Sequence, residues 1–196
     1  MLNIGGLNRC TTIDYPGELA AVIFCQGCPW HCAYCHNRHL LPEQAGTIIS
    51  WEEIIRFLGH RRGLLDAVVF SGGEPTMQSS LLEAISAVKG LGFLIGLHTA
   101  GIFPEVLEQV LPLTDWVGMD IKAPFEEYEV ITGIPGSGVA ALMSAELVRQ
   151  SGVRHRFRTT LDPFLLEDGR IEALQLQVAG EWGSELEIQQ MTLLKH

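Results

Sequence analysis

Short apolar segments alternate with amphipathic segments along the whole chain, and this alternation constrains the fold more than any other feature. The apolar segments have the length of buried strands, and the amphipathic ones carry apolar residues at helical spacing. We predict strands over Leu19–Phe24, Ala67–Phe70, Phe93–His98, Asp115–Ile121, Val153–Leu161 and Glu185–Gln190. We predict helices over Trp51–Arg62, Ser79–Leu91, Pro104–Leu111, Val139–Gln150 and Ile171–Val178. The pattern indicates an α/β protein with a parallel sheet and right-handed crossovers.

The chain length selects among α/β architectures. A complete eight-unit barrel takes about 250 residues, whereas this chain has 196. We therefore expect one domain, a partial (β/α)6 TIM-like barrel over residues 19–190 with an N-terminal extension over residues 1–18. A doubly wound open sheet is the alternative. In both architectures functional groups collect at the C-terminal ends of the parallel strands.

Composition and charge exclude several classes of protein. Hydrophobic residues make up 47% of the chain and charged residues 18%, which is typical of a folded core and excludes disorder. The net charge of −10 argues against nucleic acid as a partner, although a basic protein surface stays possible. No apolar run approaches the roughly 20 residues of a membrane helix, and the first residues do not resemble a secretory signal. We expect a cytoplasmic protein that binds no membrane.

Four of the five cysteines follow the first predicted strand directly, as Cys25, Cys28, Cys32 and Cys35. Disulfide frameworks spread cysteines through a chain, so this cluster indicates a reduced metal-binding loop. Either all four cysteines bind one metal, or Cys28-x3-Cys32-x2-Cys35 binds it and Cys25 is a buried bystander. Thiolates suit zinc and iron–sulfur clusters. Zinc ribbons separate their cysteine pairs by a dozen or more residues, so the short spacing favours iron–sulfur.

The spacing Cys28-x3-Cys32-x2-Cys35, with Tyr34 before the last cysteine, resembles the signature of the radical S-adenosylmethionine superfamily. The resemblance implies that these cysteines hold a 4Fe-4S cluster, whose fourth iron is bound by S-adenosyl-L-methionine (SAM), on a partial six-unit barrel. The wider segment CQGCPWHCAYCHN, preceded by TTIDYPG, resembles the activating proteins of anaerobic ribonucleotide reductase. These proteins are related to the pyruvate formate-lyase activases. In this family Cys25 is not a cluster ligand.

The resemblance implies an oxidoreductase that reductively cleaves SAM to methionine and a 5′-deoxyadenosyl radical. The radical would generate a glycyl radical on an anaerobic ribonucleotide reductase, and a flavodoxin or ferredoxin type donor would supply the electron. No side chain is expected to act as an acid or base, because the cofactor carries the chemistry. Two other functions stay open: a different radical SAM enzyme acting on a small molecule or peptide, and a non-enzymatic zinc or iron–sulfur protein.

The segment Gly72-Gly73-Glu74-Pro75 ends the second predicted strand. On its own such a string is often only a tight turn. In the activases it resembles the segment that receives the amino group of the methionine part of SAM. A cationic amine needs acceptors, and glycines let the backbone approach closely. Glu74 either accepts from this amine or braces the turn.

Charged residues mark the ends of the fourth and fifth predicted strands. Asp120 and Lys122 are two apart, so their side chains share a face; the alternative is an exposed ion pair. By resemblance, Lys122 neutralises the cofactor carboxylate, and Asp120 accepts from ribose hydroxyls or holds a cation. Arg154, Arg156 and Arg158 also share a face, which is either the mouth of the barrel or a solvated surface. Arg158 lies nearest the C-terminal end and is our candidate for cofactor binding.

The third predicted strand ends in His98-Thr99-Ala100-Gly101, where related activases carry Asp-Thr-Asn-Gly. Thr99 matches and offers a hydroxyl to the cofactor. His98 departs from the pattern, which argues against a monovalent cation site, and it is equally readable as a satisfied strand-end histidine. Tyr34 and His36 flank the last cysteine, and the resemblance implies that the backbone of this stretch contacts adenine.

Overall fold

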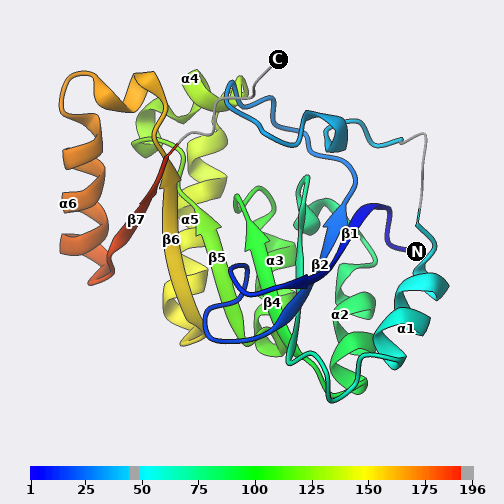
Figure 1. The fold of residues 1–196 in the computed structure, drawn as a ribbon. Helices are drawn as coiled ribbons and strands as arrows, with labels where there is room; N and C mark the ends of the chain where they lie inside the picture. Colours follow the sequence, from blue (N-terminus) through cyan, green and yellow to red (C-terminus); the bar gives the residue numbers. More distant parts are fainter. Residues whose placement is uncertain (45–48, 191–196) are drawn as a thin grey trace.

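The computed structural model describes residues 1–44 and 49–190. Its strands form one seven-stranded sheet whose spatial order follows the chain (Figure 1). The strands are β1 (Ile4–Thr11), β2 (Ala20–Cys25), β3 (Ala67–Gly72), β4 (Leu94–Thr99), β5 (Trp116–Asp120), β6 (Arg154–Thr160) and β7 (Leu186–Gln189). Strands β2 to β7 pair in parallel, each with the next, and β1 pairs antiparallel with β2. The six predicted parallel strands are confirmed.

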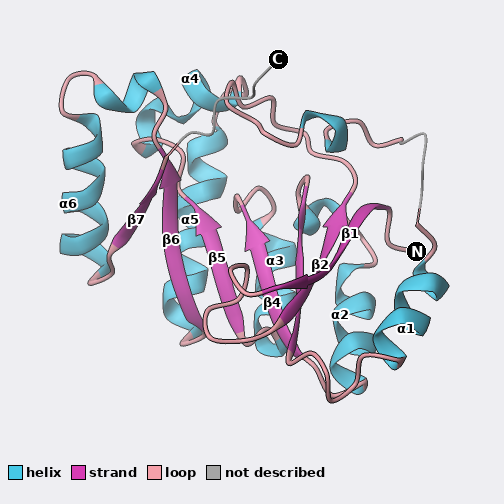
Figure 2. Ribbon diagram, in the orientation of Figure 1, coloured by secondary structure: helices cyan, strands magenta, loops and turns pink. Residues whose placement is uncertain are grey.

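The longer helices cover one face of the sheet (Figure 2). They are α1 (Trp51–Gly59), α2 (Leu81–Gly90), α3 (Pro104–Val110), α5 (Ser137–Ser151) and α6 (Arg170–Trp182), with a short α4 (Tyr128–Thr132) near the end of β5. Short 3-10 turns are η1 (Arg38–Leu40), η2 (Pro75–Met77), η3 (Leu111–Leu113), η4 (Phe125–Glu127) and η5 (Pro163–Leu166). A doubly wound sheet carries helices on both faces, so this arrangement favours the partial barrel.

The start of α1 shows how local sequence fixes these helices. The Ser50 hydroxyl accepts a hydrogen bond from the Glu53 backbone N–H at 3.2 Å, and the Glu53 carboxylate accepts from the Ser50 N–H at 3.0 Å. This reciprocal capping box satisfies two of the N–H groups that a helix start leaves unpaired. It therefore sets the first residue of α1.

Strand β1 lies in the N-terminal extension, where the sequence analysis predicts no strand. Its sequence, IGGLNRCT, contains two glycines and three polar residues, which weakens any alternation of apolar and polar positions. Ile4 pairs with Cys25 and Thr11 with Ala20, with register shifts between them. The strand is thus specified by pairing with the edge of β2 and not by its own periodicity.

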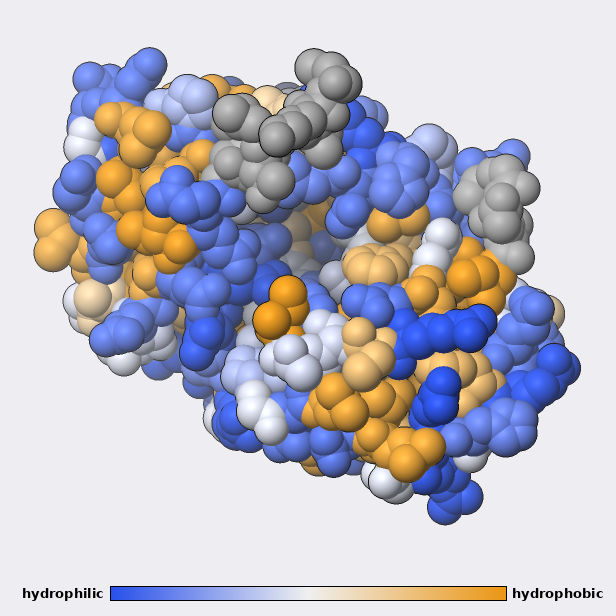
Figure 3. Space-filling model, viewed as in Figure 1, coloured by the Kyte–Doolittle hydropathy of each residue, from blue (hydrophilic) through white to orange (hydrophobic). Residues whose placement is uncertain are grey.

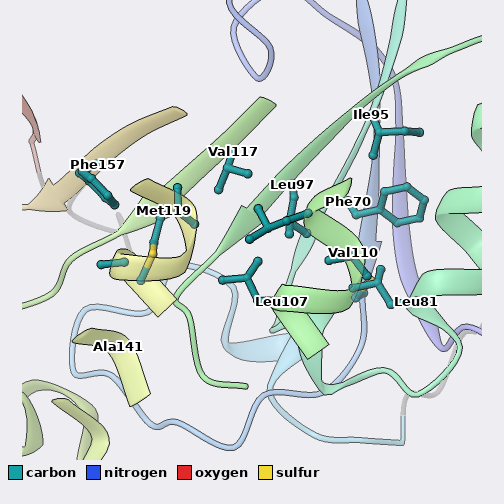
Figure 4. Packing of buried hydrophobic residues seen from close by; sticks show 14 of the residues in the cluster. Phe70, Leu81, Ile95, Leu97, Leu107, Val110, Val117, Met119, Ala141 and Phe157 are labelled. Carbon is teal, nitrogen blue, oxygen red and sulfur yellow. The ribbon is translucent and has the colours of Figure 1, made fainter. Parts of the chain in front are cut away.

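The main core lies between the sheet and its helices. Figure 4 shows Leu97, Met119 and Phe157, from three successive strands, on the side of the sheet where the helix residues Leu107 and Ala141 lie. All five side chains are fully buried. Because the core lies on this side, the opposite face of the strands is free to carry polar groups.

The inner face of the sheet is closed at its N-terminal end by the segment between β1 and β2. Tyr15 of this segment is 1% exposed and belongs to a small apolar cluster with Ala20, Val22, Ala67, Val69 and Trp116. Its ring lies 5.6 Å from that of Trp116. A Cβ on Gly96 of β4 would lie only 3.0 Å from the Tyr15 ring. The Tyr15 ring can pack against β4 at this point because Gly96 has no side chain.

Replacing Tyr15 by alanine is expected to destabilise the fold by about 3 kcal/mol, because it leaves a cavity where a buried aromatic ring packed. Denaturant unfolding monitored by circular dichroism measures the change. Ile13→Ala is the matched control, since Ile13 is 85% exposed and its loss is expected to cost under about 0.5 kcal/mol. Equal losses in the two variants would contradict this account of the inner face.

In the described part of the chain, no single helix is both long and apolar enough to cross a membrane. One pair, Phe125–Thr132 with Ser137–Ser151, meets these criteria of length and composition only when taken together, and it is bent by 119° at its break.

Candidate cluster and cofactor site

A cavity of about 240 Å³ opens at the C-terminal ends of the strands, beneath the loop that follows β2. Figure 3 shows a hollow near the middle of the face of the molecule that is in view. Most of the predicted site residues line the cavity: Cys28, Cys32, Tyr34, Cys35, His36, Gly72, Gly73, Thr99, Asp120, Lys122 and Arg158. The structure brings residues from five strands and the cysteine loop together at this end of the sheet.

The four clustered cysteines divide into two groups. Cys28, Cys32 and Cys35 are partly exposed and line the cavity. Cys25 ends β2, is fully buried and packs in the main core. The structure therefore brings together the three cysteines of the x3-x2 spacing and separates Cys25 from them.

The chemistry of these three thiols fits a cubane cluster. In residues 1–44 and 49–190, no three His, Cys, Asp or Glu side chains converge closely enough to hold a single metal ion. A cubane does not require such convergence, because each thiolate binds a different iron. Burial raises the pKa of Cys28 to about 12 and raises that of Cys32, so both thiols are protonated until iron binds and displaces their protons.

Backbone contacts fix the cysteine loop on both sides of the cavity. The Gly27 carbonyl accepts from the Glu74 N–H at 2.9 Å, which ties the loop to the end of β3. The His31 N–H donates to the Thr132 carbonyl of α4 at 3.0 Å. Trp30 is 3% exposed and contacts the Tyr128 ring edge-on at 5.8 Å. The short helix α4, which the sequence analysis does not predict, thus supports one wall of the site.

Gly72 and Gly73 bring backbone to the cavity wall where no side chain could fit. Gly72 has a φ of +112°, and a Cβ there would lie 2.5 Å from the Cys25 nitrogen. A Cβ on Gly73 would overlap the Gly27 carbonyl group. Gly72 is therefore required by its close pairing with the end of β2, and Gly73 by the close approach of the cysteine loop.

Glu74 is fully buried and braces the turn. Its carboxylate accepts from the Thr76 N–H at 3.0 Å, the Thr76 hydroxyl at 2.6 Å, the Thr99 hydroxyl at 2.7 Å and the Ala100 N–H at 2.9 Å. Burial raises the pKa of Glu74, and these four donors oppose that rise. Of the two roles left open for Glu74, the geometry is that of a brace between β3 and β4. The Thr99 hydroxyl is committed to the same brace.

Asp120, Lys122 and Arg158 form a charged group on the cavity wall. The Asp120 carboxylate is 2.8 Å from one Arg158 nitrogen and 3.7 Å from Lys122 Nζ, which also lies 5.5 Å from the centre of the Tyr34 ring. Desolvation opposes the charge of Asp120, but Arg158 and Lys122 hold its pKa below the usual value. Burial likewise opposes the charge of Lys122, yet Tyr34 and Asp120 hold its pKa above the usual value. The three charges leave one net positive charge facing the cavity.

The three alternating arginines of β6 have different surroundings. The side chain of Arg158 is 13% exposed and belongs to the cavity, whereas that of Arg156 is 50% exposed and pairs with Glu187. Arg154 is exposed. The shared face therefore runs from solvent into the cavity, and only its C-terminal end reaches the site.

Several cavity residues were not among our candidates, and Ser71, Thr160 and Gln189 are polar ones that lie on strands. Thr160 and Gln189 are the last residues of β6 and β7. The rule that functional groups collect at strand ends applies to both, and exact strand boundaries would have identified them. Ser71 precedes the glycines, and nothing in its local sequence distinguishes it.

Comparisons with known proteins agree with this geometry. The Radical SAM superfamily model matches residues 22–176. A protein of Methanocaldococcus jannaschii named as a glycyl-radical enzyme activating enzyme is 33% identical over 177 residues, covering 86% of this chain and 72% of its own. The pyruvate formate-lyase-activating enzyme of Clostridium pasteurianum is 32% identical over 173 residues, covering 85% and 71%. The chain therefore belongs to the radical SAM superfamily and, within it, to the glycyl-radical enzyme activating enzymes.

Solved structures confirm the fold class. QueE from Escherichia coli matches with a TM-score of 0.57 and 16% identity, over 96% of this chain and 93% of its own. The structure of anSMEcpe with bound AdoMet matches with a TM-score of 0.68 and 16% identity, over 85% and 49%. These structures confirm the predicted partial barrel, and the family model with the two relatives confirms the predicted family and its cofactors, a 4Fe-4S cluster and SAM.

Proposed function

We propose that this chain activates an anaerobic ribonucleotide reductase by generating a glycyl radical on it, in an anaerobic cytoplasm. The observation that carries the proposal is a single cavity lined by three cysteine thiols, two glycines and a group of fixed charges. The activase-like segments at residues 11–17 and 25–37 support the choice of partner. When bound, the cluster supplies one electron and SAM supplies the 5′-deoxyadenosyl radical.

Each part of the cavity has a task that matches its chemistry. Cys28, Cys32 and Cys35 would hold a 4Fe-4S cluster, and Cys25 is buried in the core, away from the cavity. The backbone of Gly72 and Gly73 offers acceptors to the cationic amine of SAM. Lys122 and Arg158 give the opposite wall the positive charge that a carboxylate requires.

The protein's contribution is binding, orientation and exclusion of water. Trp30 and Tyr128 form a buried aromatic wall beside the cysteine loop, which limits solvent access to the cluster. No side chain has to take or give a proton. A flavodoxin or ferredoxin type protein is the electron donor we propose, because the cluster must be reduced at a low potential.

Electron paramagnetic resonance tests this function. Reconstituted protein, SAM, a reductant and the candidate reductase are expected to give a glycine-centred doublet, and the reductase with its radical glycine replaced by alanine gives none. SAM cleavage without a doublet would indicate a different radical SAM reaction on a small molecule or peptide. Colourless, zinc-loaded protein after anaerobic purification would defeat both.

A further inference from the structure

His98 lies on β4 and lines the cavity together with the charged group. Its Nε2 atom is 2.9 Å from the backbone carbonyl oxygen of Asp14. A carbonyl oxygen only accepts hydrogen bonds, so Nε2 must carry the proton. The segment between β1 and β2 therefore selects the tautomer of this histidine.

The other ring nitrogen of His98, Nδ1, is a hydrogen-bond acceptor whose one neighbouring donor is distant. Nδ1 is 3.4 Å from the Ser71 hydroxyl, a long contact for a hydrogen bond from a hydroxyl. Desolvation and the neighbouring Arg158 guanidinium lower the pKa of His98 to about 4, so the ring is neutral at physiological pH. Nδ1 thus presents an unprotonated lone pair at the cavity wall.

The other polar groups of the cavity are already committed or suit other parts of SAM. The Asp120 carboxylate is engaged by Arg158 and Lys122. The two cations suit the carboxylate of the methionine part, and the glycine backbone suits its amine. An unprotonated Nδ1 needs a neutral hydrogen-bond donor, and the ribose of SAM carries hydroxyls that supply one.

We propose that Nδ1 of His98 accepts a hydrogen bond from a ribose hydroxyl of SAM, with the Ser71 hydroxyl as the second polar group at the same point. The inference rests on the proposed use of this cavity for SAM. It gives a role to the motif Thr11-Thr12-Ile13-Asp14-Tyr15, which the proposed function leaves unexplained. The Thr11 hydroxyl donates to the Asp14 carboxylate at 2.6 Å, and buried Tyr15 anchors the segment, so the motif positions His98.

Two substitutions separate the nitrogens of His98. In His98→Gln, the amide nitrogen reaches the level of Nε2 and keeps the bond to Asp14, but no acceptor remains at Nδ1. In His98→Asn, the amide oxygen stays at the level of Nδ1 and the bond to Asp14 is lost. We expect His98→Gln to weaken SAM binding by about three- to tenfold, the effect of one neutral hydrogen bond. His98→Asn keeps an acceptor at the level of Nδ1 but loses the bond that positions it, so we expect it to weaken SAM binding less than His98→Gln and to lower the midpoint of thermal unfolding.

The decisive measurement is anaerobic equilibrium dialysis of reconstituted protein with SAM and with its 2′-deoxy and 3′-deoxy analogues. For one analogue, the wild type and His98→Gln are expected to bind equally, because the hydroxyl that His98 accepts from is already absent. A similar loss for SAM and both analogues, or no loss for any of them, overturns the inference. Absence of SAM binding by the wild type would instead defeat the proposed function.

Discussion

Replacing Cys28, Cys32 or Cys35 by alanine removes the iron–sulfur cluster, and with it SAM cleavage. A cubane held at only three corners loses a ligand that no neighbouring thiol replaces, since Cys25 is buried in the core. We expect iron content to fall from about four atoms per chain to near zero. Iron analysis and the visible absorption of anaerobically reconstituted protein measure the loss.

Cys25→Ala is the matched control within the same loop. Its thiol packs against apolar side chains, so its removal is expected to cost about 1 kcal/mol and leave the iron content unchanged. Iron loss in this variant alone, with folding preserved by circular dichroism, would show that the ligands are assigned wrongly. Circular dichroism on all four variants separates unfolding from loss of a ligand.

Gly73→Ala is expected to weaken SAM binding by roughly ten- to a hundredfold, as a local distortion that costs about 1–3 kcal/mol would do. The new Cβ would overlap the Gly27 carbonyl, which lies one residue before the first cluster cysteine and accepts from the Glu74 N–H. Backbone on both sides cannot yield as a flexible side chain would, so either the cysteine loop or the end of β3 must move. Overpacking of this kind also costs about 1–3 kcal/mol of stability. Anaerobic equilibrium dialysis and denaturant unfolding measure the two effects.

Gly90→Ala controls for the substitution itself. Gly90 ends α2, and an added Cβ there would meet no atom within 4 Å. Because alanine favours helix over glycine, this variant is expected to gain up to about 1 kcal/mol and to bind SAM normally. Unchanged SAM affinity in Gly73→Ala would mean that the contact between the loop and β3 is not needed by the site.

The strands and helices that pack on one another were predictable because each shows its own periodicity. Strands β2 to β5 are nearly continuous apolar segments, as expected of strands in a parallel sheet. Strand β1 and helix α4 lack such a signal. Helix α4 spans five residues and is held by the cysteine loop through the Thr132 carbonyl, so its position depends on contacts distant in sequence.

The site was predictable where a rule of local geometry applied. The two-residue spacing predicted that Asp120 and Lys122 share a face, and both line the cavity although β5 ends at Asp120. The position of Arg158 nearest the C-terminal end of its strand selected it among the three arginines. The partners of Glu74 and His98 could not be predicted in this way. Glu74 is completed by Thr99, 25 residues away, and His98 by Asp14, 84 residues away. Such pairs depend on which segments become neighbours in the fold, and a local sequence pattern does not predict that.

The sequential order of the strands has a consequence for biosynthesis. Because every strand pairs with the next one along the chain, the sheet is able to grow from its N-terminal hairpin as the polypeptide is made. The three thiols leave the ribosome with β2, well before β5 and β6 deliver Asp120 and Arg158 to the cavity. A nascent chain therefore carries these thiols without the charged residues that complete the cavity until β6 has left the ribosome.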